Sequence, residues 1–481
     1  MSYLQLLKIA SPEAIVVLTA LIVLTIGLAR ARSDAICSAI AAFGLVTAAV
    51  AVSLLPSANL YGGMLVVTPL TSLFQIICLV LALLTVLLAH GNRVSRHHAE
   101  YLAIILLGTV GLMLLVGSEE LLMIFLGLEL TGLSLYVLTA FDTADARSAE
   151  AGLKYFLFGS TASAFTLFGL SFVYGTSGTT ALAALAARET STSPLLVAGL
   201  VMTLVGFAFK IAAAPFHLWA PDTYQAAPTA SAAFIASGSK VASFVVLGKI
   251  LLIGFAPMHG SAEWHTLLPG WSPILAALAA LSIILGNLVA LAQTSVRRLL
   301  AYSAVAHAGY TLLGLIAGGR EGFAATLFYT TIYAVTILGA FAVVGEVQRE
   351  TGGDHLVNFT GLRARSPFLA ACMTVFMLSL AGLPPLAGFF GKFYLFSAAL
   401  RTGGHSGLVW LVSVALFGSL VSLYYYLLVL KRVLVDTETE SIPSASIGLL
   451  RRTVAGLLAL AVVLLGVMPQ YLLGPIGRSL K

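Results

Sequence analysis

Ionisable residues inside long apolar segments are the first feature of this sequence that points to chemistry. Four of them lie deep within such segments: Glu129, Lys210, Lys240 and Lys392. A charged side chain at the centre of a bilayer costs at least about 2.5 to 3.5 kcal/mol, so it is retained only with partners, in a wet cavity or in its neutral form. The four positions therefore predict proton transfer within a membrane.

A carboxylate and a lysine that can separate form a proton switch. Burial disfavours the charged form of a lysine, and a nearby carboxylate favours it. We expect Glu129 to hold Lys210 charged when the two are close. When the pair opens, Lys210 becomes acidic enough to pass its proton inward toward Lys240.

His307 is a further candidate for this relay. It lies in the segment Ala304–Tyr310, about eight residues into another apolar run. Imidazole changes its charge near neutral pH, which suits a proton relay. A single buried histidine is more often a hydrogen-bond partner in the core, but the other ionisable residues at similar depth favour the relay.

Lys154 and His217 are less specific candidates. Lys154 starts its apolar segment close to several acidic residues, which is typical of an interfacial anchor, and the alternative is that it tunes the Glu129 site. His217 follows Lys210 by seven residues, nominally on the same helix face, although Pro215 disturbs that geometry. A relay role and satisfaction of a broken helix remain open for His217.

Two other polar positions are interpreted as structural. Lys249 follows Lys240 by nine residues, so it faces the opposite side of the helix near its end and is expected to snorkel to water. The pair Pro221-Asp222 is typical of a helix stop and an interface anchor.

The composition identifies the elements that must position these residues. The 481-residue chain is 59% apolar and only 9% charged, and its mean hydropathy is +1.03. Soluble domains carry roughly 25% charged residues. The apolar runs are long enough to cross a bilayer as helices and lack the alternation of barrel strands. We therefore expect an all-α polytopic membrane protein of about fourteen transmembrane helices.

The expected spans alternate in direction, and the basic residues divide unevenly between the two sides. The spans are residues 12–30, 35–55, 68–89, 100–117, 120–140, 152–174, 194–219, 226–254, 271–292, 299–318, 322–347, 367–400, 407–431 and 452–473. One set of loops holds Arg30, Arg32, Arg93, Arg96, Arg147, Arg297, Arg298, Arg349, Arg363, Arg365, Lys431, Arg432, Arg451 and Arg452. The other set, with the tails, holds Lys8, Arg188, Arg320, Arg401, Arg478 and Lys481. The positive-inside rule places the first set in the cytoplasm and both termini on the opposite side of the membrane.

Two spans carry proline in their interior, at residues 212–217 and 381–388. Proline opens the helix backbone, which survives at membrane depth only beside protein or a water-filled cavity. Five spans separate the breaks, so spans 4–8 and 9–13 are expected to form two inverted five-helix repeats, with helices 7 and 12 broken. The expected single membrane domain comprises three N-terminal helices (1–97), the first repeat (98–255), the second repeat (270–432) and a C-terminal helix (450–481).

Other functional classes find little support in the sequence. The three cysteines are far apart, with no spacing typical of a metal site, and no basic run with aromatic residues indicates nucleic-acid binding. Loops of no more than about twenty residues leave no room for a nucleotide-binding or redox domain. We expect no cofactor and no metal on this chain.

The broken segments carry a family resemblance. Lys210, the run Pro-Phe-His-Leu-Trp-Ala-Pro-Asp at 215–222, Ala227-Pro228-Thr229 and Lys240 resemble the antiporter-like membrane subunits of respiratory complex I, NADH-quinone oxidoreductase. The run Gly-Leu-Pro-Pro-Leu-Ala-Gly-Phe-Phe-Gly-Lys-Phe at 382–393 is similar to the branch known as subunit N. Lys392 stands where subunit M has glutamate, and the long lateral helix of subunit L is missing.

The resemblance implies roles and partners. It implies that Glu129 and Lys210 form the switching pair, that Lys240 is the central relay and that Lys392 is the lysine on the exit side. It also implies that NADH, flavin, iron–sulfur clusters and quinone bind to other subunits of the complex.

The resulting expectation is a proton-translocating membrane-arm subunit, part of an enzyme without carrying its redox site. Its partners would be other membrane subunits and the lipid bilayer. The alternatives are a subunit of a multisubunit cation/proton antiporter, a stand-alone secondary carrier, and a structural scaffold with inert lysines. A carrier would need substrate-specific polar groups at the breaks, yet residues 212–216 and 383–387 are mainly Ala, Pro, Leu and Phe.

Overall fold

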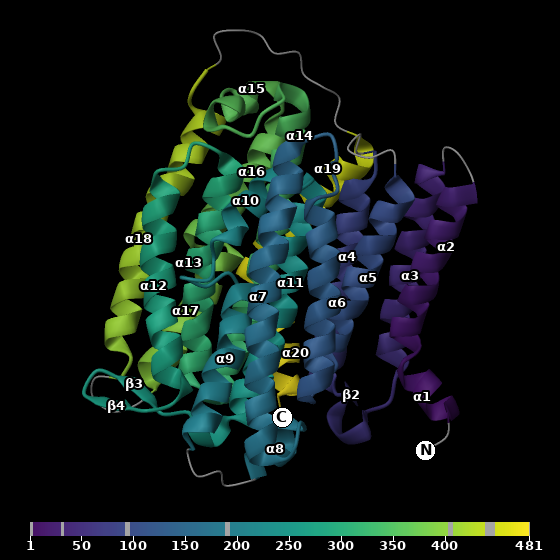
Figure 1. The fold of residues 1–481 in the computed structure, drawn as a ribbon. Helices are drawn as coiled ribbons and strands as arrows, with labels where there is room; N and C mark the ends of the chain where they lie inside the picture. Colours follow the sequence, from purple (N-terminus) through teal and green to yellow (C-terminus); the bar gives the residue numbers. More distant parts are fainter. Residues whose placement is uncertain are drawn as a thin grey trace.

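The computed structural model describes residues 3–29, 33–91, 97–187, 193–402, 407–437 and 448–480, and it is an all-helical bundle with two short hairpins (Figure 1). The helices are α1 (Tyr3–Ile9), α2 (Ser11–Ala29), α3 (Asp34–Leu54), α4 (Pro69–Ala89), α5 (His98–Val116), α6 (Leu121–Thr139), α7 (Ala146–Ser177), α8 (Leu182–Ala187), α9 (Pro194–Lys210), α10 (Trp219–Ala226), α11 (Thr229–Lys249), α12 (Trp271–Leu291), α13 (Val296–Ala317), α14 (Gly319–Thr351), α15 (Leu362–Arg365), α16 (Pro367–Ala381), α17 (Ala387–Arg401), α18 (Val409–Leu434), α19 (Leu449–Val467) and α20 (Gln470–Ser479).

The two hairpins are small antiparallel pairs. In the first, β1 (Ala58–Leu60) pairs with β2 (Leu65–Val67), and in the second, β3 (Ser261–Glu263) pairs with β4 (Thr266–Leu268). Both lie toward the lower face of the bundle in Figure 1, where the N-terminus is also found. A π-helical turn, Ile250–Gly254, extends α11.

Twelve helices of the described chain are long and apolar enough to cross a membrane, which confirms a polytopic membrane fold. Two shorter apolar helices, α9 and α16, stand where the broken spans were expected. Most expected boundaries agree within three residues, but α7 begins six residues earlier than residue 152. The last expected span is two helices, because the chain leaves α19 after Val467 and α20 begins at Gln470.

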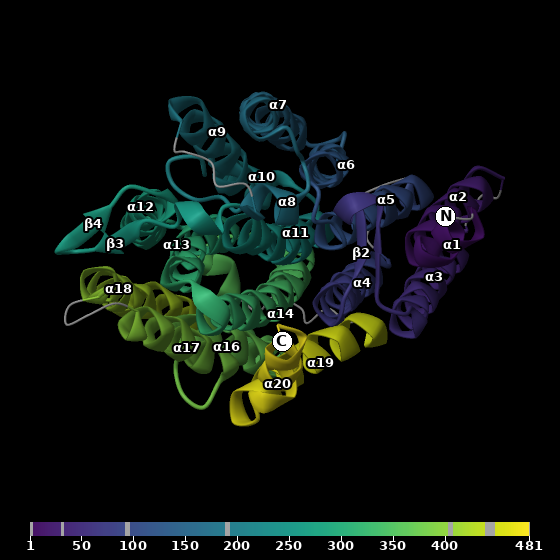
Figure 2. The same ribbon diagram turned by 90° about the horizontal axis from the view of Figure 1, so that it is seen from below.

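The central helices form the core. In the most apolar windows of α11, α13 and α14, 94% of the residues are buried, whereas the corresponding figure for α7 is 33%. Figure 2 shows α11, α13 and α14 in the middle of the bundle, with α6, α7 and α9 along one margin and α2 and α3 at one end. Side chains on the central helices are therefore shielded by protein on all sides, while α7 presents most of its surface outward.

The first break separates α9 from α10, as the prolines predict. The chain leaves the helix after Lys210 and turns through a cis Ala214-Pro215 peptide before Trp219. The amide of Ala214 donates to Ser282 Oγ of α12 at 2.8 Å, and Trp219 Nε1 donates to the carbonyl of Phe209 at 3.0 Å. Neighbouring side chains thus bind the backbone groups that the break sets free.

The second break separates α16 from α17. Gly382 adopts a φ of +86°, a left-handed conformation that glycine tolerates better than other residues. The amide of Gly388 donates to Ser379 Oγ at 3.2 Å, and Lys392 Nζ donates to the carbonyl of Ala381 at 3.0 Å. The lysine thus binds a carbonyl at the C-terminal end of α16, where the helix dipole favours a cation.

The loops on the upper face of Figure 1 join α6 to α7, α10 to α11, α12 to α13 and α14 to α15. Several residues used for the topology expectation, namely Arg30, Arg32, Arg93, Arg96, Arg188 and Lys481, lie outside the described residues. Arg147, Arg297 and Arg349 lie at the upper ends of their helices, together with others of the same set.

Candidate functional site

Glu129 and Lys210 face one small cavity between α6, α7 and α9. Glu129 lies near the middle of α6, and Lys210 is the last residue of α9. Both line a cavity of about 20 Å³. The structure records no direct ion pair between these two residues, both of which it describes. The two side chains that the sequence predicts to form a switch thus share a cavity without an ion pair between them.

Ser163 on α7 completes this site. Its hydroxyl donates a short hydrogen bond to Glu129 Oε1. Because α7 is one of the least buried helices, the carboxylate is held from the outer side of the bundle. Movement of α7 would therefore carry the partner of Glu129 with it.

Lys240 lies in the core, near the middle of α11. Its side chain is only 2% exposed, and its ammonium donates to the carbonyl of Ala304 on α13 at 2.6 Å. The ammonium also lies 5.2 Å from the ring centroid of Tyr333 on α14, a distance at which a cation is attracted to an aromatic face. Lys240 is thus held by a carbonyl and a ring.

His307 lies one helical turn from Ala304 and is also buried. Its Nδ1 is 2.6 Å from the Tyr329 hydroxyl, and its Nε2 is 3.0 Å from the Tyr426 hydroxyl. Its ring centroid lies 5.0 Å from that of Tyr333, the residue beneath Lys240. Both ring nitrogens therefore have hydroxyl partners, which is the arrangement that a proton relay through imidazole requires.

Lys392 follows the second break on α17. Besides the carbonyl of Ala381, its ammonium contacts Ser419 Oγ on α18 at 2.9 Å. It lies 5.2 Å from the ring centroid of Tyr310, which is itself 5.6 Å from the ring of His307. A continuous series of ring contacts thus joins Lys240 to Lys392 through His307.

A second hydrogen-bonded group adjoins this series. Asn287 Nδ2 donates to the Tyr310 hydroxyl at 2.9 Å, and the Tyr425 hydroxyl donates to Asn287 Oδ1 at 3.0 Å. Asn287 lies on α12, so α12, α13 and α18 are joined by polar contacts in an otherwise apolar interior.

Lys154 lies at the upper end of α7, and it is 42% exposed, as expected for an anchor. It contacts Glu150 at 2.7 Å and Asp222 at 2.9 Å. The prediction that Asp222 belongs to a helix stop is wrong, because Asp222 lies within α10, which begins at Trp219. Asp222 also binds Arg298 at 2.7 Å and so connects two helices rather than marking an end.

His217 lies in the first break and is buried. The same-face argument with Lys210 does not apply, because α9 ends at Lys210. Nδ1 of His217 finds no hydrogen-bond partner among the described residues, and its ring lies 6.2 Å from that of Tyr302. The geometry does not connect His217 directly to Lys210.

The expectation that Lys249 snorkels to water is wrong. Its side chain is 1% exposed, and its ammonium donates to the carbonyl of Val116 at 2.9 Å and lies 3.3 Å from Glu119. The C-terminal end of α5 and the following loop supply these partners, which helix position alone does not reveal.

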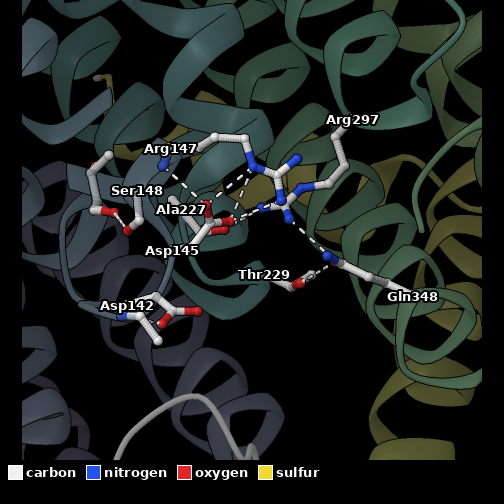
Figure 3. Close-up of polar contacts among 10 residues, drawn as sticks. Asp142, Asp145, Arg147, Ser148, Ala227, Thr229, Arg297 and Gln348 are labelled. Atoms are coloured by element: carbon white, nitrogen blue, oxygen red, sulfur yellow. Dashed lines mark hydrogen bonds and ion pairs between the residues drawn. The ribbon is translucent and has the colours of Figure 1, made fainter. Parts of the chain in front are cut away.

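A polar cleft opens above the core between the two halves of the bundle. Its volume is about 370 Å³, and Asp145, Arg147, Arg297 and Gln348 contribute to its lining. Figure 3 shows the guanidinium groups of Arg147 and Arg297 beside Asp145. The Arg147 hydrogen bond holds the pKa of Asp145 below its usual value. Arg297 is buried, and it donates to the carbonyl of Tyr224 at 2.8 Å.

The comparisons with known proteins identify the family. The model of the family described as "NADH:quinone oxidoreductase/Mrp antiporter, TM" matches residues 118–422, which include every ionisable residue of the site. This chain belongs to that family. The resemblance inferred from the broken segments is confirmed.

Individual relatives cover nearly the whole chain. The chain is 47% identical to "NADH-quinone oxidoreductase subunit N 2" of Acidobacterium capsulatum, over 98% of each protein. It is 32% identical to a chain of respiratory complex I from Thermus thermophilus, with a TM-score of 0.81 and coverage of 96% and 98%. A chain of the Mrp complex from a Dietzia species has a TM-score of 0.84 at 22% identity, covering 98% of this chain and 97% of that one, and it shares the fold.

Sequence reasoning missed the neutral partners of the ionisable residues. Ser163, Ser419, Tyr329 and Tyr426 are ordinary residues of apolar helices when taken singly. The spacing of Tyr329 and Tyr333, four residues apart on α14, was the available signal, because such residues share one face of a helix. The partners of Ser163 and Ser419 depend on which helices meet, so no local pattern indicates them.

Proposed function

We propose that this chain is a proton-translocating membrane-arm subunit of a bacterial NADH:quinone oxidoreductase. The observation that carries the proposal is the buried series Lys240, His307 and Lys392, in a chain with 47% identity over 98% of its length to a protein named as subunit N of that enzyme. Proton transfer by this chain is coupled to quinone reduction elsewhere in the complex.

The first half of the site is the switch. Glu129 holds a proton on Lys210 when the two side chains meet, and their separation releases it inward. The cavity that both side chains line supports this role. His217 is a secondary candidate in the first break, and Lys154 tunes the switch from the upper end of α7.

The second half is the relay. Lys240 receives the proton, and His307 passes it between hydroxyl partners toward Lys392, which releases it on the exit side. The contacts of His307 with Tyr329 and Tyr426, and of Lys392 with Ser419, support this order. Each transfer changes the protonation of a nitrogen whose position is already fixed.

The proposed architecture divides the chain into three N-terminal helices (1–97), two inverted repeats (98–255 and 270–432) and a C-terminal helix (450–481). Each repeat then contains one broken helix, α9/α10 or α16/α17, which is consistent with the inversion. The basic residues on the upper face of Figure 1 favour a cytoplasmic position for that face and a periplasmic position for both termini.

The redox cofactors are assigned to partner subunits. NADH, flavin, iron–sulfur clusters and quinone would bind to other chains of the complex, and this chain would contact neighbouring membrane subunits and lipid. In the part of the chain that the structure describes, no group of three or more His, Cys, Asp or Glu is arranged to hold a metal ion.

A native preparation tests the proposal. The complex is purified through a tag on this chain, its subunits are identified, and NADH-driven proton uptake is measured after reconstitution into vesicles. We expect subunits of NADH:quinone oxidoreductase to co-purify, and Lys210→Ala to lower proton pumping. Lys431→Ala, at the upper end of α18, is the matched control and should pump normally.

The other outcomes would each support a different function. Cation/proton antiport by a preparation without redox subunits would favour the antiporter alternative, whose fold this chain shares. Unchanged pumping in Lys210→Ala, with normal assembly, would favour a structural scaffold.

A further inference from the structure

A cluster of four charged side chains lies outside the buried series, where α7, α10 and α13 meet. We call it the Asp222 cluster, and it consists of Glu150, Lys154, Asp222 and Arg298. The carboxylate of Asp222 binds Lys154 at 2.9 Å and Arg298 at 2.7 Å, one with each oxygen. Lys154 also contacts Glu150, on its own helix, at 2.7 Å. The cluster contains two cations and two anions, so its formal charges cancel.

Helix α7 connects the Asp222 cluster to the Glu129 site. Ser163, the partner of Glu129, lies nine residues after Lys154 on the same helix, or about 14 Å along its axis at 1.5 Å per residue. Tyr155, next to Lys154, stacks on Trp219 of α10 with ring centroids 4.1 Å apart and an interplanar angle of 5°. The upper end of α7 is therefore attached to α10 by an ion pair and a ring stack.

Helix α13 connects the Asp222 cluster to the relay of Lys240 and His307. Arg298 lies in the first turn of α13, and its guanidinium also binds Gln225 of α10 at 3.2 Å. Farther along α13, the carbonyl of Ala304 accepts from Lys240, and His307 follows. The Asp222 carboxylate thus joins α7, which carries the Ser163 partner of Glu129, to α13, which carries the Ala304 carbonyl that binds Lys240.

We propose that Asp222 is a positioning residue that couples the Glu129–Lys210 switch to the Lys240 relay. In the proposed cycle, Lys154 exchanges between Asp222 and Glu150, and the exchange breaks the ion pair between α7 and α10 so that α7 is held there by the Tyr155–Trp219 stack alone and can shift. The displaced α7 moves Ser163 and changes the separation of Glu129 from Lys210. This inference rests on the proposed function of the chain as a proton-translocating subunit.

The contacts of Lys154 keep the free-energy cost of this exchange low. Lys154 is 42% exposed and Asp222 is 30% exposed, and Lys154 already has both carboxylates within reach. Its charge keeps a partner in either position, so the exchange leaves no isolated cation. A cavity of about 100 Å³ next to Lys154 and Asp222 leaves room for the side chain to move. The alternative positions therefore form the two-state element that coupling between distant groups requires.

A reversible crosslink tests whether α7 must part from α10. Ala151 on α7 and Ala226 on α10 line that same cavity without belonging to the cluster. The double variant Ala151→Cys/Ala226→Cys is treated, in the full complex in vesicles, with a short thiol–thiol crosslinker that a reductant cleaves. We expect crosslinking to lower the number of protons pumped per quinone reduced at least twofold, and cleavage to restore it.

The matched control places both cysteines on the exposed side of α7. Ala149→Cys/Leu153→Cys takes the same crosslinker within a single helix and leaves α7 free to move relative to α10. We expect no change in its proton-to-quinone ratio after crosslinking. A normal ratio in the crosslinked Ala151→Cys/Ala226→Cys complex, with crosslinking verified by mass spectrometry, would overturn the proposed exchange.

Charge variants supply an independent readout. Asp222→Asn removes the negative charge that binds both cations and replaces one acceptor oxygen with an amide donor. It should lower the proton-to-quinone ratio at least twofold in a complex that assembles fully. Asp222→Glu keeps the charge and should recover most of that loss. Equal ratios in Asp222→Asn and the unaltered complex would count against the coupling role. If Lys210→Ala pumps normally, the proposed function itself fails, whereas failure of the crosslink test alone leaves that function in place.

Discussion

The two halves of the candidate site use different chemistry around the same residue type. In the first half, Lys210 faces a carboxylate, and a lightly buried helix, α7, supplies the partner of that carboxylate. In the second half, Lys240 and Lys392 are held by backbone carbonyls, by the Ser419 hydroxyl of α18 and by tyrosine rings on the buried helices α13 and α14. We propose that the first half changes its geometry during the cycle and that the second half keeps it.

This difference assigns separate tasks to the two halves. In the proposed cycle, α7 moves Ser163 and so changes the distance between Glu129 on α6 and Lys210. This distance sets the proton affinity of the lysine, because charge interactions are strong in a low-dielectric interior. Fixed hydroxyls and rings change little during a cycle, so they provide a path rather than a trigger. Variants in the two halves should therefore fail in different ways.

The largest effect is expected at Lys240, which is 2% exposed and central to the relay. Lys240→Met keeps the length of the side chain but cannot hold a proton, so we expect proton pumping to fall at least about tenfold, or roughly 1.4 kcal/mol of barrier. The rate of proton pumping is measured as proton uptake by vesicles that contain the reconstituted complex. Ser243→Ala is the control, since this buried hydroxyl binds only within its own helix, to the carbonyl of Ser239, among the described contacts.

Glu129→Gln should have the next largest effect. The amide preserves the shape and the contact with Ser163 but removes the charge that acts on Lys210. We expect pumping to fall about fivefold, or roughly 1 kcal/mol of barrier. Glu129→Asp, which retains the carboxylate, should recover part of the loss in the same vesicle assay. An equal loss in both variants would show that shape, rather than charge, matters at this position.

The hydroxyls beside His307 should contribute less. Tyr329→Phe removes the partner of Nδ1 while keeping the ring, and we expect a loss of about threefold in pumping, or roughly 0.7 kcal/mol. The control is Tyr155→Phe, because the buried Tyr155 hydroxyl has no hydrogen-bond partner among the described residues. If both variants behave alike, the relay does not pass through the Tyr329 hydroxyl.

The membrane fold was predicted well from the sequence, because long apolar runs indicate directly that the helices lie in lipid rather than in water. Both broken helices were found from their prolines, and the structure ends α9 and α16 there. The break before α20, at Pro469, was missed because apolar residues continue on both sides of this proline and the whole run was predicted to be one span. Hydropathy does not distinguish one long span from a span followed by a short helix.

The depth of the ionisable residues was predictable, but their partners were not. Apolar flanks indicate that Lys240 is buried, whereas its acceptor, the carbonyl of Ala304, lies sixty-four residues away and depends on how α11 packs on α13. The same limit explains the wrong expectation for Lys249, whose partner Glu119 comes from a distant loop. The periodicity of a helix predicts which face a side chain lies on, but it does not predict which other segment packs against that face.

The smallest effect is expected at Gly132, which lies beside the first half of the site. A methyl group at this position would stand 3.5 Å from Lys210 Nζ and 3.2 Å from the Tyr136 hydroxyl, so alanine fits only tightly. The adjoining cavity, of about 20 Å³, is barely larger than the roughly 10 to 15 Å³ that one water needs. We expect a slight narrowing there to leave no room for a water between Glu129 and Lys210.

We therefore expect Gly132→Ala to lower proton pumping by less than about twofold, or roughly 0.4 kcal/mol of barrier. Gly175→Ala on α7 is the control, because no atom lies within 4 Å of the added methyl group. This control separates the effect of narrowing the cavity from the gain in helix stability that any replacement of glycine by alanine brings. A slower exchange between Glu129 and Lys210 in Gly132→Ala alone would show that the switch works through water. Equal rates in the two variants would instead favour direct contact between the carboxylate and the ammonium, and α7 would then have to bring them together.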